Sequence, residues 1–327
     1  MKLIKKKSLS TLLMLLIVSI VVTACGGGNA KSEPTPQASS EPAGPRVVKH
    51  AMGEATVIAE PKRVVVLTNQ GTESLLALGI KPVGAVKSWI GDPWYDHIKD
   101  QMADVTVVGD ETQPNLELIT SLKPDLILGT KVRQEKIYQQ LEAIAPTVLT
   151  ENLGDSMIEN FELYAQALNK EKEGATFLEE YNKTISDVKV RLGDKTKAKV
   201  SLARFQPGKV RVYYKENFAG VILADLGFAR PDAQNKDEFS ADISKEQIDV
   251  LDGDVLFYFT SDRDGDTGAS KTADEWLKGP LAAKLNVVAK QHIFNVNEPI
   301  WNTAGGVIAA KLLIQDIEER FSKLTIQ

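Results

Sequence analysis

The histidine side chains, which could hold a zinc or manganese ion or act as a catalytic base, are few and widely spaced. The three histidines, His50, His97 and His292, lie far apart in the sequence. A zinc or manganese carrier would need several such ligands. Neither a nucleophile motif of the Gly-x-Ser-x-Gly type nor a phosphate-binding loop occurs. The residue types therefore give no positive support to an enzyme or to direct capture of a soft metal.

An acidic segment near residue 264 matches the first half of a calcium-binding loop, with Asp262, Asp264 and Asp266 at alternate positions. In such a loop a glycine follows for the turn, and a glutamate binds the ion through both oxygens. Here Thr267 stands at the glycine position and Ala273 at the glutamate position. We interpret the segment as a solvated turn.

Cationic and aromatic side chains recur in the loops that follow the expected strands. Cationic groups bind carboxylate-like oxygens, and aromatic rings form the walls of ligand pockets. Arg204 and Tyr213 are the firmest polar candidates, and Trp301 is interpreted as a wall rather than as core. Tyr258 and Phe259 face opposite sides of a strand, so one of them belongs to the core. The candidate ligand-binding residues are Lys87, Trp89, Lys131, Arg133, Arg204, Tyr213, Asn235, Phe259, Trp301 and Asn302.

The elements that must position these residues are short apolar runs alternating with amphipathic segments, a pattern typical of an α/β fold with parallel sheets. The expected strands lie at 63–67, 82–86, 125–129, 146–149, 200–205, 210–214, 254–260 and 293–296. The expected helices lie at 71–78, 116–122, 134–143 and 305–321, with one long helix between two lobes. Two such lobes predict a ligand cleft between them, lined by loops at the strand ends.

The N-terminus has the features of a secretory signal, with four lysines before an apolar run at 9–22. That run is too short for a stable membrane-spanning helix. It ends at Ala24 and is followed by Cys25, the single cysteine, in a string that resembles a bacterial lipobox. The polar segment that follows buries too little apolar surface to fold, which predicts a tether. We predict a signal peptide at 1–24 and a flexible tether at 25–45, followed by a lobe at 46–170, a linking helix at 171–195 and a second lobe at 196–327.

The charge balance argues against nucleic-acid binding. The chain has 39 basic and 44 acidic residues, a net charge of −5. Without the four lysines of the expected signal peptide, 35 basic residues remain and the net charge becomes −9. An acidic domain of this kind lacks the basic surface that phosphate backbones require.

Six sequence blocks from residue 61 onward resemble the iron-siderophore and vitamin B12 binding proteins of ABC importers. The blocks are PKRVVVL (61–67), ESLLALGIKPVG (73–84), PNLELI (114–119), LKPDLI (122–127), ISKEQI (243–248) and WNTAGG (301–306). Each block alone is weak, but their order along 62–321 is specific. The resemblance implies two Rossmann-like lobes joined by a single long helix.

Two glutamates acquire a role through this resemblance. In the family, each lobe presents a surface glutamate to arginines of the permease, and the matching positions are Glu117 and Glu246. Carboxylates at helix starts are also favoured by the helix dipole, so both could serve only their helices.

The resemblance implies a substrate-binding lipoprotein that delivers its ligand to an ABC permease dimer with its ATPase. It is nearest to binders of hydroxamate or citrate-type ferric siderophores, in which the siderophore supplies the metal ligands, so no cofactor is expected. Ferric citrate, haem, vitamin B12 and a ligand-binding sensor domain stay open as alternatives. The expected protein is a monomer, lipid-anchored at Cys25 on the extracellular or periplasmic face of the membrane.

Overall fold

The computed structural model describes residues 44–154, 156–263 and 265–326. The predicted signal peptide, Cys25 and nearly all of the predicted tether lie outside these residues, and so does Asp264.

The first lobe is built on a five-stranded sheet in which every neighbouring pair is parallel, as predicted. Its order is β5 (Thr106–Val107), β4 (Gly84–Ala85), β3 (Val64–Val66), β8 (Leu126–Thr130) and β9 (Thr147–Thr150). Every residue of β3 and β8 is buried, because helices cover both faces of such a sheet. The helices are α1 (Asn69–Ala77), α2 (Leu116–Ser121), α3 (Lys131–Gln134), η1 (Glu135–Ile137), α4 (Tyr138–Glu142) and α5 (Met157–Ala167). Two hairpins complete the lobe, β1 (Arg46–His50) with β2 (Gly53–Val57), and β6 (Gly109–Asp110) with β7 (Gln113–Pro114).

The second lobe has a mixed five-stranded sheet. Its order is β12 (Ser240–Ile243), β11 (Lys209–Tyr213), β10 (Val200–Gln206), β13 (Val255–Thr260) and β14 (Ile293–Asn295). A hairpin joins β10 to β11, and its turn contains Gly208 at φ +68°. Its strands β10, β13 and β14 are parallel, whereas β11 and β12 pair antiparallel. The helices are α7 (Phe218–Asp225), η3 (Lys245–Leu251), α8 (Gly268–Leu277), η4 (Ala282–Lys284) and α9 (Asn286–Ala289).

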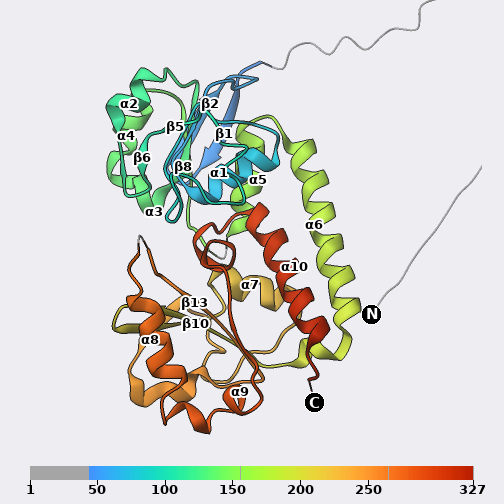
Figure 1. The fold of residues 1–327 in the computed structure, drawn as a ribbon. Helices are drawn as coiled ribbons and strands as arrows, with labels where there is room; N and C mark the ends of the chain where they lie inside the picture. The colour runs from blue at the N-terminus through green and yellow to red at the C-terminus, as the bar shows by residue number, and fades with distance from the viewer. Residues whose placement is uncertain (1–43, 155, 264, 327) are drawn as a thin grey trace, which may run out of the picture. The chain divides into compact units, whose positions relative to one another are not determined.

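One long helix, α6 (Glu171–Leu192), followed by the short η2 (Gly193–Lys197), connects the lobes (Figure 1). Its buried positions include Tyr181, Ile185, Val188 and Leu192, a spacing that forms one apolar stripe. Acidic residues occupy its first turn and basic residues its last turn, which complements the helix dipole.

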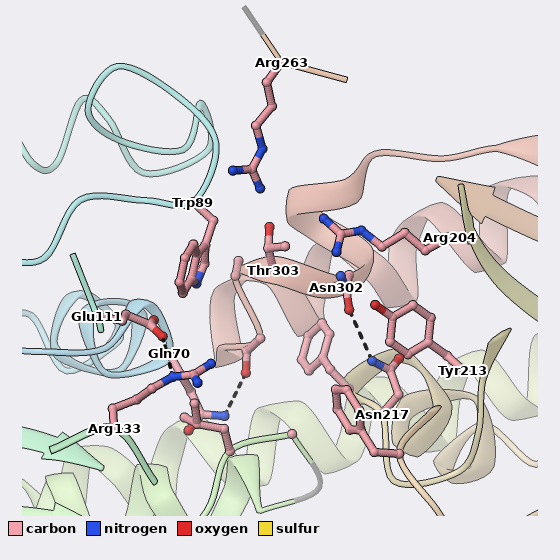
Figure 2. A pocket seen from close by; sticks show the side chains of 16 residues that line it. Gln70, Trp89, Glu111, Arg133, Arg204, Tyr213, Asn217, Arg263, Asn302 and Thr303 are labelled. Carbon is pink, nitrogen blue, oxygen red and sulfur yellow. Dashed lines mark hydrogen bonds and ion pairs between the residues drawn. The ribbon is translucent and has the colours of Figure 1, made fainter. Parts of the chain in front are cut away.

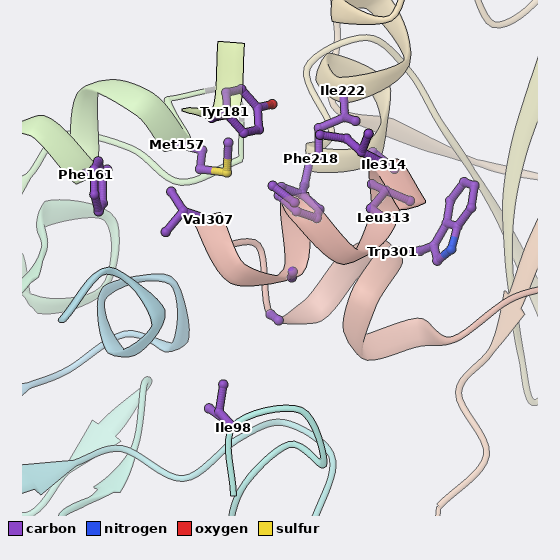
Figure 3. Packing of buried hydrophobic residues seen from close by; sticks show 14 of the residues in the cluster. Ile98, Met157, Phe161, Tyr181, Phe218, Ile222, Trp301, Val307, Leu313 and Ile314 are labelled. Atoms are coloured by element: carbon purple, nitrogen blue, oxygen red, sulfur yellow. The ribbon is translucent and has the colours of Figure 1, made fainter. Parts of the chain in front are cut away.

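The C-terminal helix α10 (Val307–Lys323) lies beside α6 and packs between the two lobes (Figures 1 and 3). Its buried Val307, Leu313 and Ile314 belong to a core cluster that contains Phe161 of the first lobe and Ile222 of the second. This shared core joins the lobes, and it confirms the predicted α/β fold of two lobes linked by a helix. Within the described residues, every helix is too short or too polar to cross a membrane.

Candidate functional site

A pocket of about 380 Å³ lies between the lobes, where loops from both sheets meet (Figure 2). The first lobe contributes Gln70, Trp89, Glu111, Arg133, Leu153 and Gly154. The second lobe contributes Arg204, Tyr213, Asn217, Phe218, Phe239 and Arg263, and the segment before α10 contributes Asn302, Thr303, Ala304 and Gly305. The volume falls within the range of small-molecule sites, roughly 300–1,000 Å³.

Three of the pocket residues follow the ends of parallel strands, as the α/β rule predicts, and two others lie within strands of the second sheet. Trp89 comes after β4, Arg133 lies in α3 directly after β8, and Arg263 comes after β13. Arg204 lies near the end of β10, and Tyr213 is the last residue of β11. Topology therefore brings cations and aromatic rings from both lobes to one place.

On the first-lobe side, Arg133 pairs with Glu111, with 3.5 Å between Nε and Oε2. Glu111 is buried, and its Oε1 accepts hydrogen bonds from the backbone N–H of Asn69 at 2.7 Å and from Asn69 Nδ2 at 2.8 Å. These donors lie at the start of α1, where a negative charge is stabilised. The carboxylate is thus fixed independently of Arg133 and holds one edge of its guanidinium.

On the second-lobe side, Arg204 pairs with Glu298, which is 4% exposed. Burial raises the pKa of Glu298, and the nearby cations Arg204 and Arg263 oppose that rise. The Nε of Arg204 is buried and donates to no residue that the structure describes. A buried donor without a partner is costly, so this N–H is available to a ligand.

A third cation, Arg263, extends into the pocket from the loop after β13 (Figure 2). It is exposed and forms no ion pair with a described residue. Arg263 was not among the predicted candidates, because the acidic segment around it was interpreted as a solvated turn. Asp262 instead accepts hydrogen bonds from the backbone N–H groups of Ala269 and Ser270, at 3.0 and 3.1 Å, and so caps the start of α8.

Aromatic side chains form the apolar walls. Tyr213 packs edge-on against Phe239 and stacks on Phe259, with 5.7 Å between ring centroids in each pair. Phe239 is 48% exposed although its side chain is large and apolar. Burial raises the pKa of Tyr213, so its phenol is neutral near pH 7 and acts as a hydrogen-bond donor. Trp89 lines the pocket from the first lobe, on the other side of Asn302 and Thr303 from Tyr213 (Figure 2).

Neutral amides lie between the two lobes. Asn217 caps α7 through Oδ1, which accepts from Ala219 N at 3.1 Å, and its Nδ2 donates to Asn302 Oδ1 at 3.2 Å. Asn302 belongs to the turn η5 (Pro299–Thr303). Polar contacts of this kind orient a ligand without adding charge.

Five predicted candidates, Trp89, Arg133, Arg204, Tyr213 and Asn302, line the pocket. Trp301 does not, and its interpretation as a wall is wrong. It is fully buried, its ring lies 4.5 Å from Phe257, and its Nε1 donates to Asp316 at 2.8 Å. Core packing and this part-buried hydrogen bond hold the indole behind the pocket.

Phe259 was also misplaced, because it is fully buried beneath Tyr213 as a core residue of β13. Lys87 and Lys131 do not line the pocket and instead pair with Asp110 at 3.2 Å and Glu151 at 2.7 Å. Asn235 is exposed outside the lining. Exposed cations find nearby carboxylates on a surface this rich in acidic residues.

The two predicted docking glutamates lie on different lobes. Glu117 is exposed in the first turn of α2, and Glu246 is exposed in the first turn of η3. A hydrogen bond with Ser244 lowers the pKa of Glu246, which keeps it charged. Their contact with a permease stays a prediction.

The chain matches the family of periplasmic binding proteins over residues 64–299. It is 48% identical to a probable siderophore-binding lipoprotein, YfiY, of Bacillus subtilis, over 97% of this chain and 99% of that protein. It is 34% identical to the Fe(3+)-citrate-binding protein YfmC of the same organism, over 85% and 86% of the two chains. The structure of Staphylococcus aureus SirA complexed with staphyloferrin B aligns with a TM-score of 0.79 and 36% identity, covering 85% of this chain and 98% of that one. The chain therefore belongs to the periplasmic binding protein family.

Proposed function

We propose that this protein is the substrate-binding lipoprotein of an ABC importer, that it captures a ferric siderophore of the hydroxamate or citrate type, and that it delivers the complex to a permease dimer with its ATPase. The supporting observation is that Arg133, Arg204 and Arg263 converge on one pocket in a chain of net charge −5. Such a local excess of cations suits an anionic, oxygen-rich ligand.

The pocket chemistry supports a complex whose iron is already enclosed. Among the described residues, no group of three or more histidine, cysteine, aspartate or glutamate side chains is arranged to hold a metal ion. Its lining contributes arginine donors and aromatic faces instead. The siderophore would thus supply the iron ligands, and the protein would recognise the outer oxygens of the complex without a cofactor of its own.

Ferric citrate is the second candidate, favoured by the 34% identity to the ferric citrate-binding relative. Haem is less well supported, because it usually takes a histidine, methionine or tyrosine as axial ligand. The one tyrosine of the lining, Tyr213, has a raised pKa, which disfavours the phenolate form. Vitamin B12 has little need for three arginines.

The remaining parts of the proposal concern location and partners. Lipidation at Cys25 would place the pocket close to the membrane on its outer face, and the likeness to a lipoprotein over 97% of this chain supports this location. Glu117 and Glu246 would contact the two permease subunits, and the protein would act as a monomer without a catalytic step.

The proposal is tested by following tryptophan fluorescence while the full chain is titrated with ferric complexes. The panel contains ferric citrate, a ferric citrate–hydroxamate siderophore, a ferric catecholate, haem and vitamin B12. We expect saturable quenching at submicromolar concentration by a hydroxamate or citrate-type complex, and weaker binding in Arg263→Ala. If only haem or vitamin B12 bound tightly, the proposed ligand class would be wrong. If no compound bound, the proposed transport role would be contradicted.

A further inference from the structure

The buried carboxylate of Glu73 lies outside the pocket lining, at the junction of three segments. Glu73 projects from α1 and is fully buried. Its Oε2 accepts hydrogen bonds from the backbone N–H groups of Ile308 at 3.0 Å and Ala309 at 2.8 Å, at the start of α10. Its Oε1 lies 2.5 Å from Nε2 of His97, in the loop that follows Trp89. One charged group therefore joins α1, the loop after β4, and the helix that packs between the lobes.

The helix α10 receives its N-terminal cap from this distant residue. The first N–H groups of a helix lack intrahelical partners, and a side chain at the N-cap position usually accepts from them. In α10 the N-cap residue is Gly306, which has no side chain. Glu73 takes over this function from another helix, and its negative charge complements the helix dipole.

The same contact explains why position 306 is glycine. A Cβ on Gly306 would lie 2.6 Å from Glu73 Oε2 and 2.7 Å from Glu73 Cβ, too close for any side chain. The backbone of Gly306 has φ −108° and ψ −179°, which other residues adopt readily. Packing against Glu73, rather than backbone conformation, therefore excludes a side chain there.

The residues directly before Gly306 line the pocket, namely Asn302, Thr303, Ala304 and Gly305. A second bond from α1 holds this segment, because Gln70 Nε2 donates to the carbonyl oxygen of Gly305 at 3.0 Å. Gln70 lines the pocket and lies one turn before Glu73. The position of segment 302–305 thus depends on two side chains of the first lobe.

We propose that Glu73 is a positioning residue for ligand binding: by capping α10 from α1, it fixes pocket segment 302–305 against the first lobe. This inference rests on the proposed function, since it assigns Glu73 a part in the affinity of that pocket. A rigid segment preserves affinity because less freedom is lost when the ligand binds.

The test compares four variants of the full chain with wild type. Glu73→Ala removes the cap, whereas Glu73→Gln keeps an oxygen that accepts from α10. Gly306→Ala keeps the charge but introduces the clash. Phe321→Leu is the matched control, because Phe321 is fully buried in the same helix and lies about 21 Å from its start. Affinity for iron(III) citrate and for an iron(III) citrate–dihydroxamate complex is measured by tryptophan quenching, and hydrogen exchange of amides 308 and 309 is measured without ligand.

We expect Glu73→Ala to weaken binding at least tenfold and to speed exchange of the two amides at least tenfold. Glu73→Gln should stay within threefold of wild type, and Phe321→Leu should lower the melting temperature without changing affinity. Gly306→Ala should weaken binding at least tenfold, because its added Cβ would lie 2.6 Å from Glu73 Oε2 and 2.7 Å from Glu73 Cβ and would push the start of α10 away from α1.

If Glu73→Ala binds as wild type does, or leaves both amides as protected as in wild type, the inference is overturned. If Glu73→Ala does not fold, Gly306→Ala is used in its place, and wild-type affinity or wild-type protection of both amides in that variant overturns the inference. Wild type that binds neither ferric complex would contradict the proposed function alone, because the exchange rates need no ligand and still test whether Glu73 fixes the start of α10.

Discussion

Each lobe places one arginine–glutamate ion pair at the pocket, Arg133–Glu111 on the first lobe and Arg204–Glu298 on the second, but the two glutamates are stabilised differently. On the first lobe, Glu111 is held by two N–H donors of Asn69, and Arg133 adds a third contact. On the second lobe, Glu298 is buried and its charge is offset chiefly by Arg204. If Arg133 is removed, Glu111 keeps its two hydrogen bonds from Asn69. If Arg204 is removed, Glu298 loses its main partner. We therefore expect the lobes to respond unequally to the same substitution.

The largest effect is expected for Arg204→Ala. This change leaves the buried carboxylate of Glu298 without its main partner, and breaking a buried pair costs about 3–5 kcal/mol. Urea denaturation should show that loss in the free energy of unfolding. The double variant Arg204→Ala/Glu298→Gln should recover most of it, and a double variant as unstable as the single one would contradict the account.

The pH dependence of stability separates the pairs further. Burial raises the pKa of Glu298 above its usual value of about 4.5. A carboxyl whose pKa is higher in the folded state binds its proton more tightly there, so stability falls as pH rises from 4.5 through the raised value. In urea denaturation between pH 4 and pH 7, the free energy of unfolding of Glu298→Gln should increase relative to that of wild type as pH rises. The opposite trend would indicate that Arg204 outweighs the burial of Glu298.

A smaller effect is expected for Arg133→Ala on the first lobe. Glu111 keeps both hydrogen bonds from Asn69, and the side chain of Arg133 is 35% exposed. The free energy of unfolding should fall by about 1 kcal/mol or less, because a partly exposed pair contributes little. Affinity for the ferric complex should nevertheless fall, as measured by fluorescence quenching. A stability loss equal to that of Arg204→Ala would remove the distinction between the pairs.

The smallest effect on stability is expected for Arg263→Ala. Arg263 is exposed, and such surface changes alter the free energy of unfolding by about 0.5 kcal/mol or less. Affinity should fall severalfold, and Arg263→Lys should restore part of it because the charge remains. An alanine variant that binds as wild type does would show that the pocket uses only the two paired arginines.

Much of this arrangement could be predicted from the sequence. The Val-Val-Val run of β3 and the Leu-Ile-Leu run of β8 are continuous apolar segments, as buried parallel strands require. The long helix α6 begins at 171, as predicted from a segment with no strand signal and no central proline or glycine. Arg204 and Tyr213 could be predicted to line the pocket because they lie on the first strand of the second lobe and on the strand that returns beside it.

The rest depends on contacts that a linear pattern does not contain. The helix α8 starts with Gly-Ala-Ser-Lys-Thr, which has few apolar residues, and its start is capped by Asp262 from outside the helix. Trp301 has the same sequence signal whether it faces the pocket or the core, and its place is set by packing against Phe257 and by the hydrogen bond to Asp316 fifteen residues later. Glu111, Phe239 and Arg263 were missed because they lie in or beside turns whose place is set by tertiary packing. Exposed aromatic and basic residues beside a strand end are the signal that could have identified the last two.

A crystal structure of the full chain with a bound ferric citrate–hydroxamate complex tests the central claim most directly. We predict that the complex fills the pocket between the lobes, that nitrogens of Arg133 and Arg204 lie about 2.7–2.9 Å from its oxygens, and that no protein atom coordinates the iron. A complex bound elsewhere on the protein, or iron coordinated by a side chain such as Tyr213, would contradict it.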